Sequence, residues 1–169
     1  MNYPGTIRLA TAADRPHFLR LWRAFLTEQR ELGSHIHATE NNVQRNCQVF
    51  DAYCGGGLAG FTLLWIPPGD AQPEGLIMAG ETPAPMVLDT DLGRSGLLWG
   101  VYVSPEYRGL GIGLSLEFAA LPLGIDYGFD TVETSVRTTN THGERMASGF
   151  GTRPAMVWSW VPLGEVKPK

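Results

Sequence analysis

The sequence predicts one mixed α/β (α+β) domain. The chain has 169 residues, which is the length of a single domain. Hydrophobic residues make up 43% of it, enough for a buried core. Strand-like and helix-like segments follow one another along its whole length, in the order β-α-α-β-β-β-α-β-α-β. We therefore treat residues 1–169 as one domain without internal repeats.

The first half of the chain opens with an alternating strand and a long amphipathic helix. Thr6–Ala10 alternates, and the oxygens of Thr11–Asp14 precede apolar residues at helical spacing that continue to Gly33. The next expected elements are a weaker helix at about 40–46, strands at 48–54 and 58–66, and a hairpin turn at 55–57.

A stretch rich in Pro, Gly, Asp and Thr follows, from about residue 67 to 95. We expect a loop-rich insertion here. Two short apolar pieces, Leu76–Ala79 and Met86–Leu88, are expected to pair as a small excursion from the domain. Long ordered insertions of this kind often carry function.

The most informative stretch begins with the apolar, buried-strand pattern of Leu97–Val103. Ser104 and Pro105 end the strand, and glycine then occupies every second position of Arg108–Gly113. An apolar helical pattern follows, which we expect to kink or end near residue 120 because proline occupies position 122. The remaining expected elements are a strand at 131–137, a helix at 140–148 and a strand at 155–161.

A strand, a glycine loop and a helix in this order favour binding of a diphosphate. The first N–H groups of a helix have no partner within it, and glycines let a backbone approach phosphate closely. The backbone of Gly109, Leu110, Gly111, Ile112 and Gly113 supplies such groups, and Arg108 adds a positive charge. No lysine follows, which excludes a Walker loop. A dinucleotide fingerprint is broken by Leu114, although Glu133 lies at the distance that such a site uses.

The run from Arg108 to Gly113 matches the pattern R/Q-x-x-G-x-G/A in full. With the strand before it, this run resembles the GNAT acetyltransferase superfamily. The resemblance implies a mostly antiparallel sheet flanked by helices, with two strands splayed at the cofactor site. It also implies that the loop holds the pyrophosphate of acetyl-coenzyme A, and it adds the backbone of Val101, Tyr102 and Val103, together with Asn140, to the cofactor-binding residues.

The implied reaction is transfer of an acetyl group from the thioester to an amine of a small molecule or a protein. Candidate catalytic residues are Arg145, Glu133 and His142, with Glu81 as another candidate base. Arg145 stands where the family often has a tyrosine, four residues before Gly149. For Glu133 and His142 a plain surface role remains open. For Trp22, Phe25 and Trp99 core packing is favoured over lining the acceptor groove.

Composition limits the other functions. The net charge of −4 gives no indication of nucleic-acid binding, and the longest apolar run, Leu58–Ile66, is too short for a membrane span. No leader pattern is present, so we expect a cytoplasmic protein, for which a homodimer is an option. No metal site is expected from His35, His37 and Glu40, nor from the two cysteines. Two alternatives stay open: a non-catalytic acyl-coenzyme A-binding or regulatory module, and a domain for another diphosphate nucleotide.

Overall fold

The computed structural model describes residues 5–32, 39–69, 72–81, 93–136 and 140–149. The helices are α1 (Arg15–Glu31), α2 (Glu40–Cys54), α3 (Ile112–Asp126) and α4 (Thr141–Gly149), and the strands are β1 (Thr6–Leu9), β2 (Gly60–Ile66), β3 (Gly75–Glu81), β4 (Ser95–Val103) and β5 (Thr131–Thr134). Two short 3-10 turns, Ala12–Asp14 and Pro105–Tyr107, precede α1 and the glycine loop.

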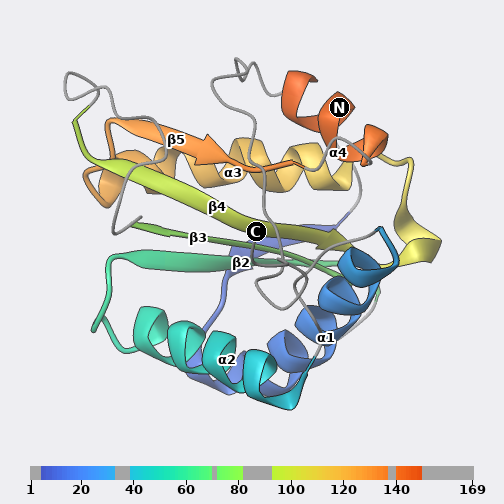
Figure 1. Ribbon diagram of the computed structural model, residues 1–169, viewed down its shortest axis with the longest axis horizontal. Helices are drawn as coiled ribbons and strands as arrows, with labels where there is room; N and C mark the ends of the chain where they lie inside the picture. The colour runs from blue at the N-terminus through green and yellow to red at the C-terminus, as the bar shows by residue number, and fades with distance from the viewer. Residues whose placement is uncertain (1–4, 33–38, 70–71, 82–92, 137–139, 150–169) are drawn as a thin grey trace, which may run out of the picture.

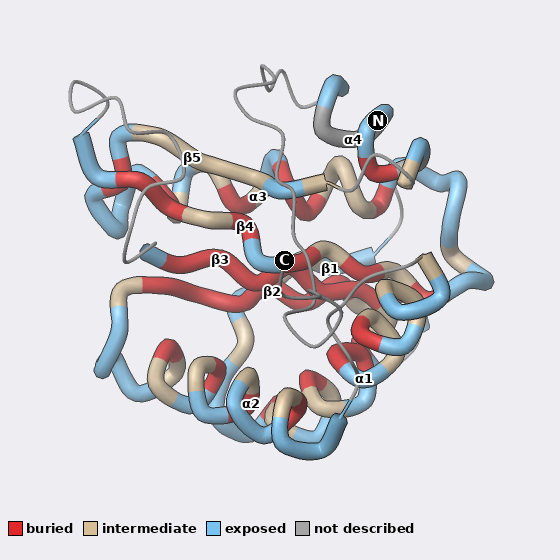
Figure 2. Tube along the Cα trace, in the orientation of Figure 1, coloured by how far each residue is buried: buried red, intermediate tan, exposed pale blue. Residues whose placement is uncertain are grey.

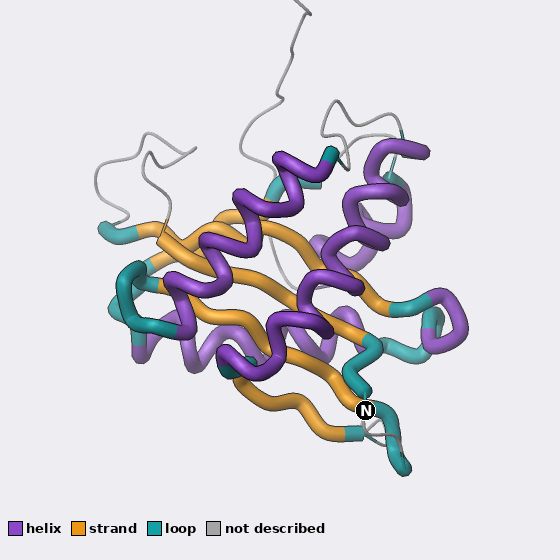
Figure 3. Tube along the Cα trace, turned by 90° about the horizontal axis from the view of Figure 1, so that it is seen from below, coloured by secondary structure: helices purple, strands orange, loops and turns teal. Residues whose placement is uncertain are grey.

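The five strands form one sheet in the order β1-β2-β3-β4-β5. The first four pair antiparallel, and β5 joins β4 in parallel. Helices α1 and α2 cover one face, whereas α3 lies on the other with α4 beyond it (Figures 1 and 3). The expected fold class, a mostly antiparallel mixed sheet between helices, is confirmed.

Alternating side chains of the central strands build two cores, one on each face of the sheet. Figure 2 shows the buried residues along the middle strands and along the helices that cover them. On the α1/α2 face, Leu64 of β2 and Met78 of β3 pack with Phe18 and Phe50. On the α3 face, Leu63 and Ile77 pack with Leu116. Both faces of the middle strands are therefore buried, which makes this sheet a fixed frame for the elements at its edge.

The predicted strand at 48–54 is wrong, because these residues form the second half of α2. Val43, Cys47, Phe50 and Tyr53 recur at spacings of three and four and are all buried in the core below the sheet. That helical period outweighs the local strand preference of the Val49–Tyr53 run. The three glycines after it end the helix and do not form a hairpin turn between strands.

The predicted insertion at 67–95 is also wrong in its middle, where β3 runs through the centre of the sheet. Six of the seven residues of β3 are buried, and it pairs with both β2 and β4. The prolines on either side suggested a loop, but they only mark the two ends of this short strand. Leu76–Ala79 thus belongs to the main sheet, and Met86–Leu88 lies outside the described residues.

Helix α3 continues to Asp126 and passes through Pro122, beyond the break that the sequence predicts. Pro122 is exposed, so water can bind the backbone group that the proline nitrogen leaves without a donor. Strand β5 ends at Thr134, three residues before the predicted end. The predicted strand at 155–161 and the pair His35 and His37 lie outside the described residues.

Candidate active site

Strands β4 and β5 begin as a pair and then separate. Their register runs from Ser95 opposite Thr131 to Leu98 opposite Thr134, where β5 ends, while β4 continues to Val103. Figure 1 shows the two strands diverging toward their C-terminal ends. The splay implied by the resemblance is therefore present, and it leaves one edge of residues 99–103 without a β5 partner in the described sheet.

A β-bulge marks the point of separation. Met78 of β3 is opposite Gly100, but its neighbour Ala79 is opposite Leu98, so Trp99 is the extra residue on β4. A bulge turns the local backbone and re-aims its groups. Beyond it, Val101, Tyr102 and Val103 pair with β3 on one side only within the described sheet.

The glycine loop lies where β4 ends and α3 begins. Gly109 and Gly111 have φ of 74° and 79°, a left-handed conformation that suits glycine. The first hydrogen bond of α3 runs from the Ser115 N–H, which donates, to the Gly111 carbonyl. The N–H groups of Ile112, Gly113 and Leu114 therefore lie in the first turn, where a helix offers them no partner. A side chain on Gly109 would have no neighbour within 4 Å. These residues fit a pyrophosphate group, because they combine free backbone donors with open space.

Arg108 is held by groups outside the loop. Its Nη1 and Nη2 donate to the two carboxylate oxygens of Glu28 on α1, at 3.1 and 2.5 Å, and its Nε donates to the Val103 carbonyl at 2.8 Å. The guanidinium also lies over the Tyr102 ring, 5.4 Å from its centre. Phosphate binding by Arg108 stays a prediction, and it requires sharing or release of the Glu28 contact.

Glu133 lies on the α1/α2 face of the sheet edge. Its neighbour Val132 packs in the core under α3, so strand alternation turns Glu133 to the opposite face. There Ser95 Oγ donates to its Oε1 at 2.7 Å. Glu133 is thus half-buried and held beside the point where β4 and β5 separate, and its role as a base stays a prediction.

Trp99 is 42% exposed and lies beside Tyr53 of α2. Its indole lies close enough to the hydroxyl of Tyr53 to lower the pKa of that hydroxyl in part. The Tyr53 ring lies directly against Gly60 and Gly80, which face each other in β2 and β3, and any side chain on either glycine would collide with it. Burial raises the pKa of Tyr53, which keeps its hydroxyl neutral. Core packing, expected for Trp99, is therefore wrong, whereas Trp22 is in the core.

Helix α4 carries the remaining predicted residues. Asn140 caps it, since its Oδ1 accepts from the Gly143 N–H at 2.9 Å. Arg145 is exposed, and His142 lies in the first turn of the helix. A helix-capping role for Asn140 is thus observed, and the cofactor role of Asn140 and the catalytic roles of Arg145 and His142 stay predictions. Glu81 pairs with Arg94 at the far end of β3, away from the loop, which gives it a structural role.

Sequence reasoning missed one ionisable residue, Glu117 in α3. It is 2% exposed, and its Oε2 has no hydrogen-bond partner in the described part of the chain. Burial raises its pKa to about 7. The signal for it was a single acid within the apolar run Leu114–Leu121.

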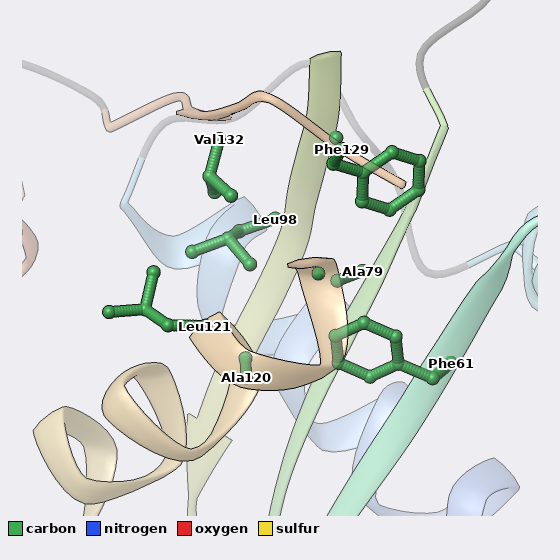
Figure 4. A pocket seen from close by; sticks show the side chains of 9 residues that line it. Phe61, Ala79, Leu98, Ala120, Leu121, Phe129 and Val132 are labelled. Atoms are coloured by element: carbon green, nitrogen blue, oxygen red, sulfur yellow. The ribbon is translucent and has the colours of Figure 1, made fainter. Parts of the chain in front are cut away.

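A small apolar pocket lies under the second half of α3, at the other end of this helix from the loop. Phe61, Leu98 and Phe129 line it, together with Ala120 of α3 (Figure 4). It belongs to the core and offers no polar group to a ligand. Within the described residues, no cluster of three metal-ligating side chains is found, and no helix has the length and hydropathy to cross a bilayer.

Comparison with known proteins tests the resemblance. The sequence profile of the Acetyltransferase (GNAT) family matches residues 15–151, which include every element from α1 to α4. The chain belongs to the GNAT acetyltransferase family. The loop at 108–113 lies within the matched residues, between β4 and α3, and its binding of a cofactor stays a prediction.

Relatives of this GNAT chain include enzymes that acetylate amines. It is 26% identical over 147 residues to thialysine N-epsilon-acetyltransferase of Sus scrofa, a match that covers 87% of this chain and 83% of the other. Among solved structures, an aminoglycoside N-acetyltransferase AAC(6')-Iy in complex with CoA superimposes with a TM-score of 0.74 at 14% identity, covering 96% of each chain. A GCN5-related N-acetyltransferase from Ralstonia eutropha gives 0.73 at 19% identity, covering 95% and 99%. These two likenesses show the fold.

Proposed function

We propose that this GNAT protein transfers an acetyl group from acetyl-coenzyme A to an amine, by direct attack of the amine on the thioester. The observation that carries the proposal is the position of the glycine loop beside the gap between β4 and β5. The glycine loop fits a pyrophosphate, and the separation of β4 from β5 exposes strand backbone to a ligand that lies between them. A ligand with a diphosphate and an extended amide arm would engage both.

On the cofactor side, the N–H groups of Ile112, Gly113 and Leu114 would hold the pyrophosphate, and the backbone of residues 101–103 would hold the arm. Acetyl-coenzyme A supplies an activated acetyl group when bound. A backbone N–H near the bulge at Trp99 would stabilise the negative charge that develops on the acetyl oxygen. One such donor is worth about 3–4 kcal/mol of barrier. Positioning of the two reactants accounts for much of the rest.

On the acceptor side, Trp99 and Glu133 share the α1/α2 face of the sheet edge. An alkylammonium of pKa ~10 must lose a proton before it attacks. Glu133 would accept this proton, directly or through a water molecule. As the C–N bond forms and the C–S bond breaks, Arg145 would stabilise the departing thiolate. The Trp99 ring would hold the body of the amine, since an indole face attracts cations and apolar groups alike.

The relatives support an amine acceptor as a class. Two of these relatives are named as acetyltransferases of thialysine and of aminoglycosides, and both compounds carry primary amines. The glycine loop and the separated strands of this chain are compatible with the same kind of reaction. We therefore propose an amine of a small molecule as the preferred acceptor and an amine of a protein as the second choice.

A release assay for free thiol tests the proposal directly. Purified protein is given acetyl-coenzyme A and a panel of amines that includes thialysine, lysine, a polyamine and an aminoglycoside. We expect thiol release with at least one amine, and loss of release in the Glu133→Gln variant. Thermal shift with acetyl-coenzyme A, NAD and ATP runs beside it. Binding of acetyl-coenzyme A without turnover would favour the non-catalytic module, and stabilisation by NAD or ATP alone would favour another nucleotide.

A further inference from the structure

Glu117 is the most unusual buried group in the described structure. A carboxylate oxygen that is cut off from water normally has a partner, because an unsatisfied buried acceptor costs about 1–3 kcal/mol. Glu117 is 2% exposed, and its Oε2 has no partner among the described residues. The contacts of α3 show which part of the molecule this oxygen faces.

Helical spacing places Glu117 on the flank of α3 that faces β5 and α4. The residues of α3 that face the sheet are Ile112, Leu116 and Ala120. Glu117 lies on the adjacent side of the helix, on the same side as Gly124, seven residues further along. A side chain on Gly124 would lie 3.9 Å from Val132 of β5. Leu114 lies next to Glu117 around the helix, further from the sheet. A Cβ atom added to Gly149 of α4 would lie 3.9 Å from the Leu114 side chain.

Along the helix, Glu117 is level with the separated part of β4. The side chain of its neighbour Leu116 would lie 3.4 Å from a Cβ atom added to Gly75 in β3. Gly75 is paired with Val103 of β4. Gly124 is seven residues further on, roughly 10 Å along the helix, where β4 and β5 are still paired. Glu117 therefore faces the side on which β5 leaves β4, at the height of residues 102–103.

We propose that Glu117 forms part of the wall of the cofactor cleft, where its carboxylate accepts a hydrogen bond from an amide N–H of the pantetheine arm. The inference rests on the proposed function, which places that arm between β4 and β5. The arm carries two amide groups, and backbone carbonyls of β4 can accept only from donors on their own side. A carboxylate on α3 would supply an acceptor from the opposite wall.

Binding would then be linked to release of a proton. Because burial raises the pKa of Glu117 to about 7, about half of the ligand-free molecules carry this proton at neutral pH. An N–H donor favours the ionised form, so the proton would pass to the buffer as the hydrogen bond forms. Affinity for the ligand would therefore rise as pH increases through 7.

Other ionisable groups near α3 do not account for the same behaviour. Among the described residues they are Glu81, Tyr102, Tyr107, Glu133, His142, Glu144 and Arg145. Tyr107 precedes the loop and its ring packs on Trp65. Tyr102 and Glu133 lie on the opposite face of the sheet, and Glu81 is paired with Arg94 at the far end. On α4, Glu144 and Arg145 are exposed, and His142 is the one residue whose removal must be tested beside Glu117.

The test uses coenzyme A, which binds without turnover, and calorimetry in phosphate and Tris buffers from pH 6 to 8. The difference in heat between the buffers gives the number of protons released. We expect wild type to release about half a proton more at pH 7 than Glu117→Gln, which keeps an acceptor oxygen but cannot ionise. Glu117→Leu removes the acceptor and should weaken binding about tenfold. Controls are Glu106→Gln, exposed beside the loop, and His142→Gln.

Equal proton release by wild type and Glu117→Gln would overturn the proposal, as would wild-type affinity in a folded Glu117→Leu variant. Loss of the signal in His142→Gln alone would assign the proton to α4 and also overturn it. These outcomes are separate from failure of the proposed function. In that case wild type would show no binding of coenzyme A and no acetyl transfer, whereas here both would persist without the Glu117 signature.

Discussion

Arg108 and Glu28 form a two-pronged ion pair that joins the glycine loop to α1, across 80 positions of sequence. Both side chains are about one-third exposed, so the pair contributes at most about 1 kcal/mol to stability. Its larger effect is on position, since it holds the guanidinium beside Val103 and over Tyr102.

Release of this pair should favour phosphate binding. In Glu28→Gln the arginine keeps its charge but loses its carboxylate partner, so we expect coenzyme A to bind a few-fold more tightly. In Arg108→Ala the charge is lost, and binding should weaken about tenfold. Calorimetry at two salt concentrations measures both. A Glu28→Gln variant that binds as weakly as Arg108→Ala would show that the pair serves to shape the loop and that Arg108 does not contact phosphate.

The glycine loop can be tested with a matched pair of substitutions. Gly109 and Gly56 have nearly the same left-handed φ, 74° and 71°, and neither has a neighbour within 4 Å of a new side chain. Alanine at either position should cost about 1–2 kcal/mol of folding stability. Only Gly109→Ala should lower the affinity for coenzyme A, because its methyl group enters the space that we assign to phosphate. Gly111→Val should abolish binding in a folded protein. Equal affinities in the two alanine variants would contradict the loop assignment.

The exposed ring of Trp99 depends on Tyr53. Tyr53→Phe keeps the ring against Gly60 and Gly80 but removes the hydroxyl group that lies near the indole of Trp99. We expect the KM for the amine to rise several-fold while coenzyme A binding is unchanged. Tyr127→Phe, at the exposed end of α3, is the matched control. If both variants show the wild-type KM, Trp99 is not part of the acceptor site.

Stability should fall as pH rises from about 4.5 to about 7, because burial raises the pKa of Glu117 in the folded state to about 7. Below this range both states are protonated and the group has no effect. Within it the unfolded chain ionises while the folded chain keeps the proton, which lowers stability by up to about 3 kcal/mol, and the loss is complete above pH ~7. Glu117→Gln should match wild type in urea unfolding below pH ~4.5 and exceed it at pH 8. Glu106→Gln should follow the wild-type profile. Parallel profiles for wild type and Glu117→Gln would show that Glu117 ionises without cost.

The sequence predicted those parts of the fold in which local pattern and tertiary packing agree. The strand at 97–103, its glycine loop and the start of α3 have such a pattern, and the structure has them in that order. Up to α4, where the described residues end, the predicted order of elements also agrees with the observed one, but for a mistaken reason. A false strand at 48–54 compensated for the omission of β3, whose flanking prolines hid a central position in the sheet.

The candidate site was predictable only in its backbone. Glycine spacing is visible in a sequence, whereas the contacts of Trp99 with Tyr53 and of Ser95 with Glu133 join distant residues. The Arg108–Glu28 pair is of the same kind. Glu117 could have been singled out as an acid in an apolar helix, but its orientation depends on how α3 lies across β4 and β5.

In the described sheet, β4 is paired more extensively with β3 than with β5, so the two strands that border the splay differ in how readily they separate from their neighbours. Seven residue pairs join β4 to β3, while four join it to β5. Strands with fewer cross-strand bonds open more often without global unfolding, and their amides exchange with solvent sooner. We therefore expect the amides of residues 131–134 to exchange well before those of β3 and β4. A substrate bound between the strands would then contact β4, which stays paired with β3, on one side. On the other side it would contact β5, which opens and closes locally.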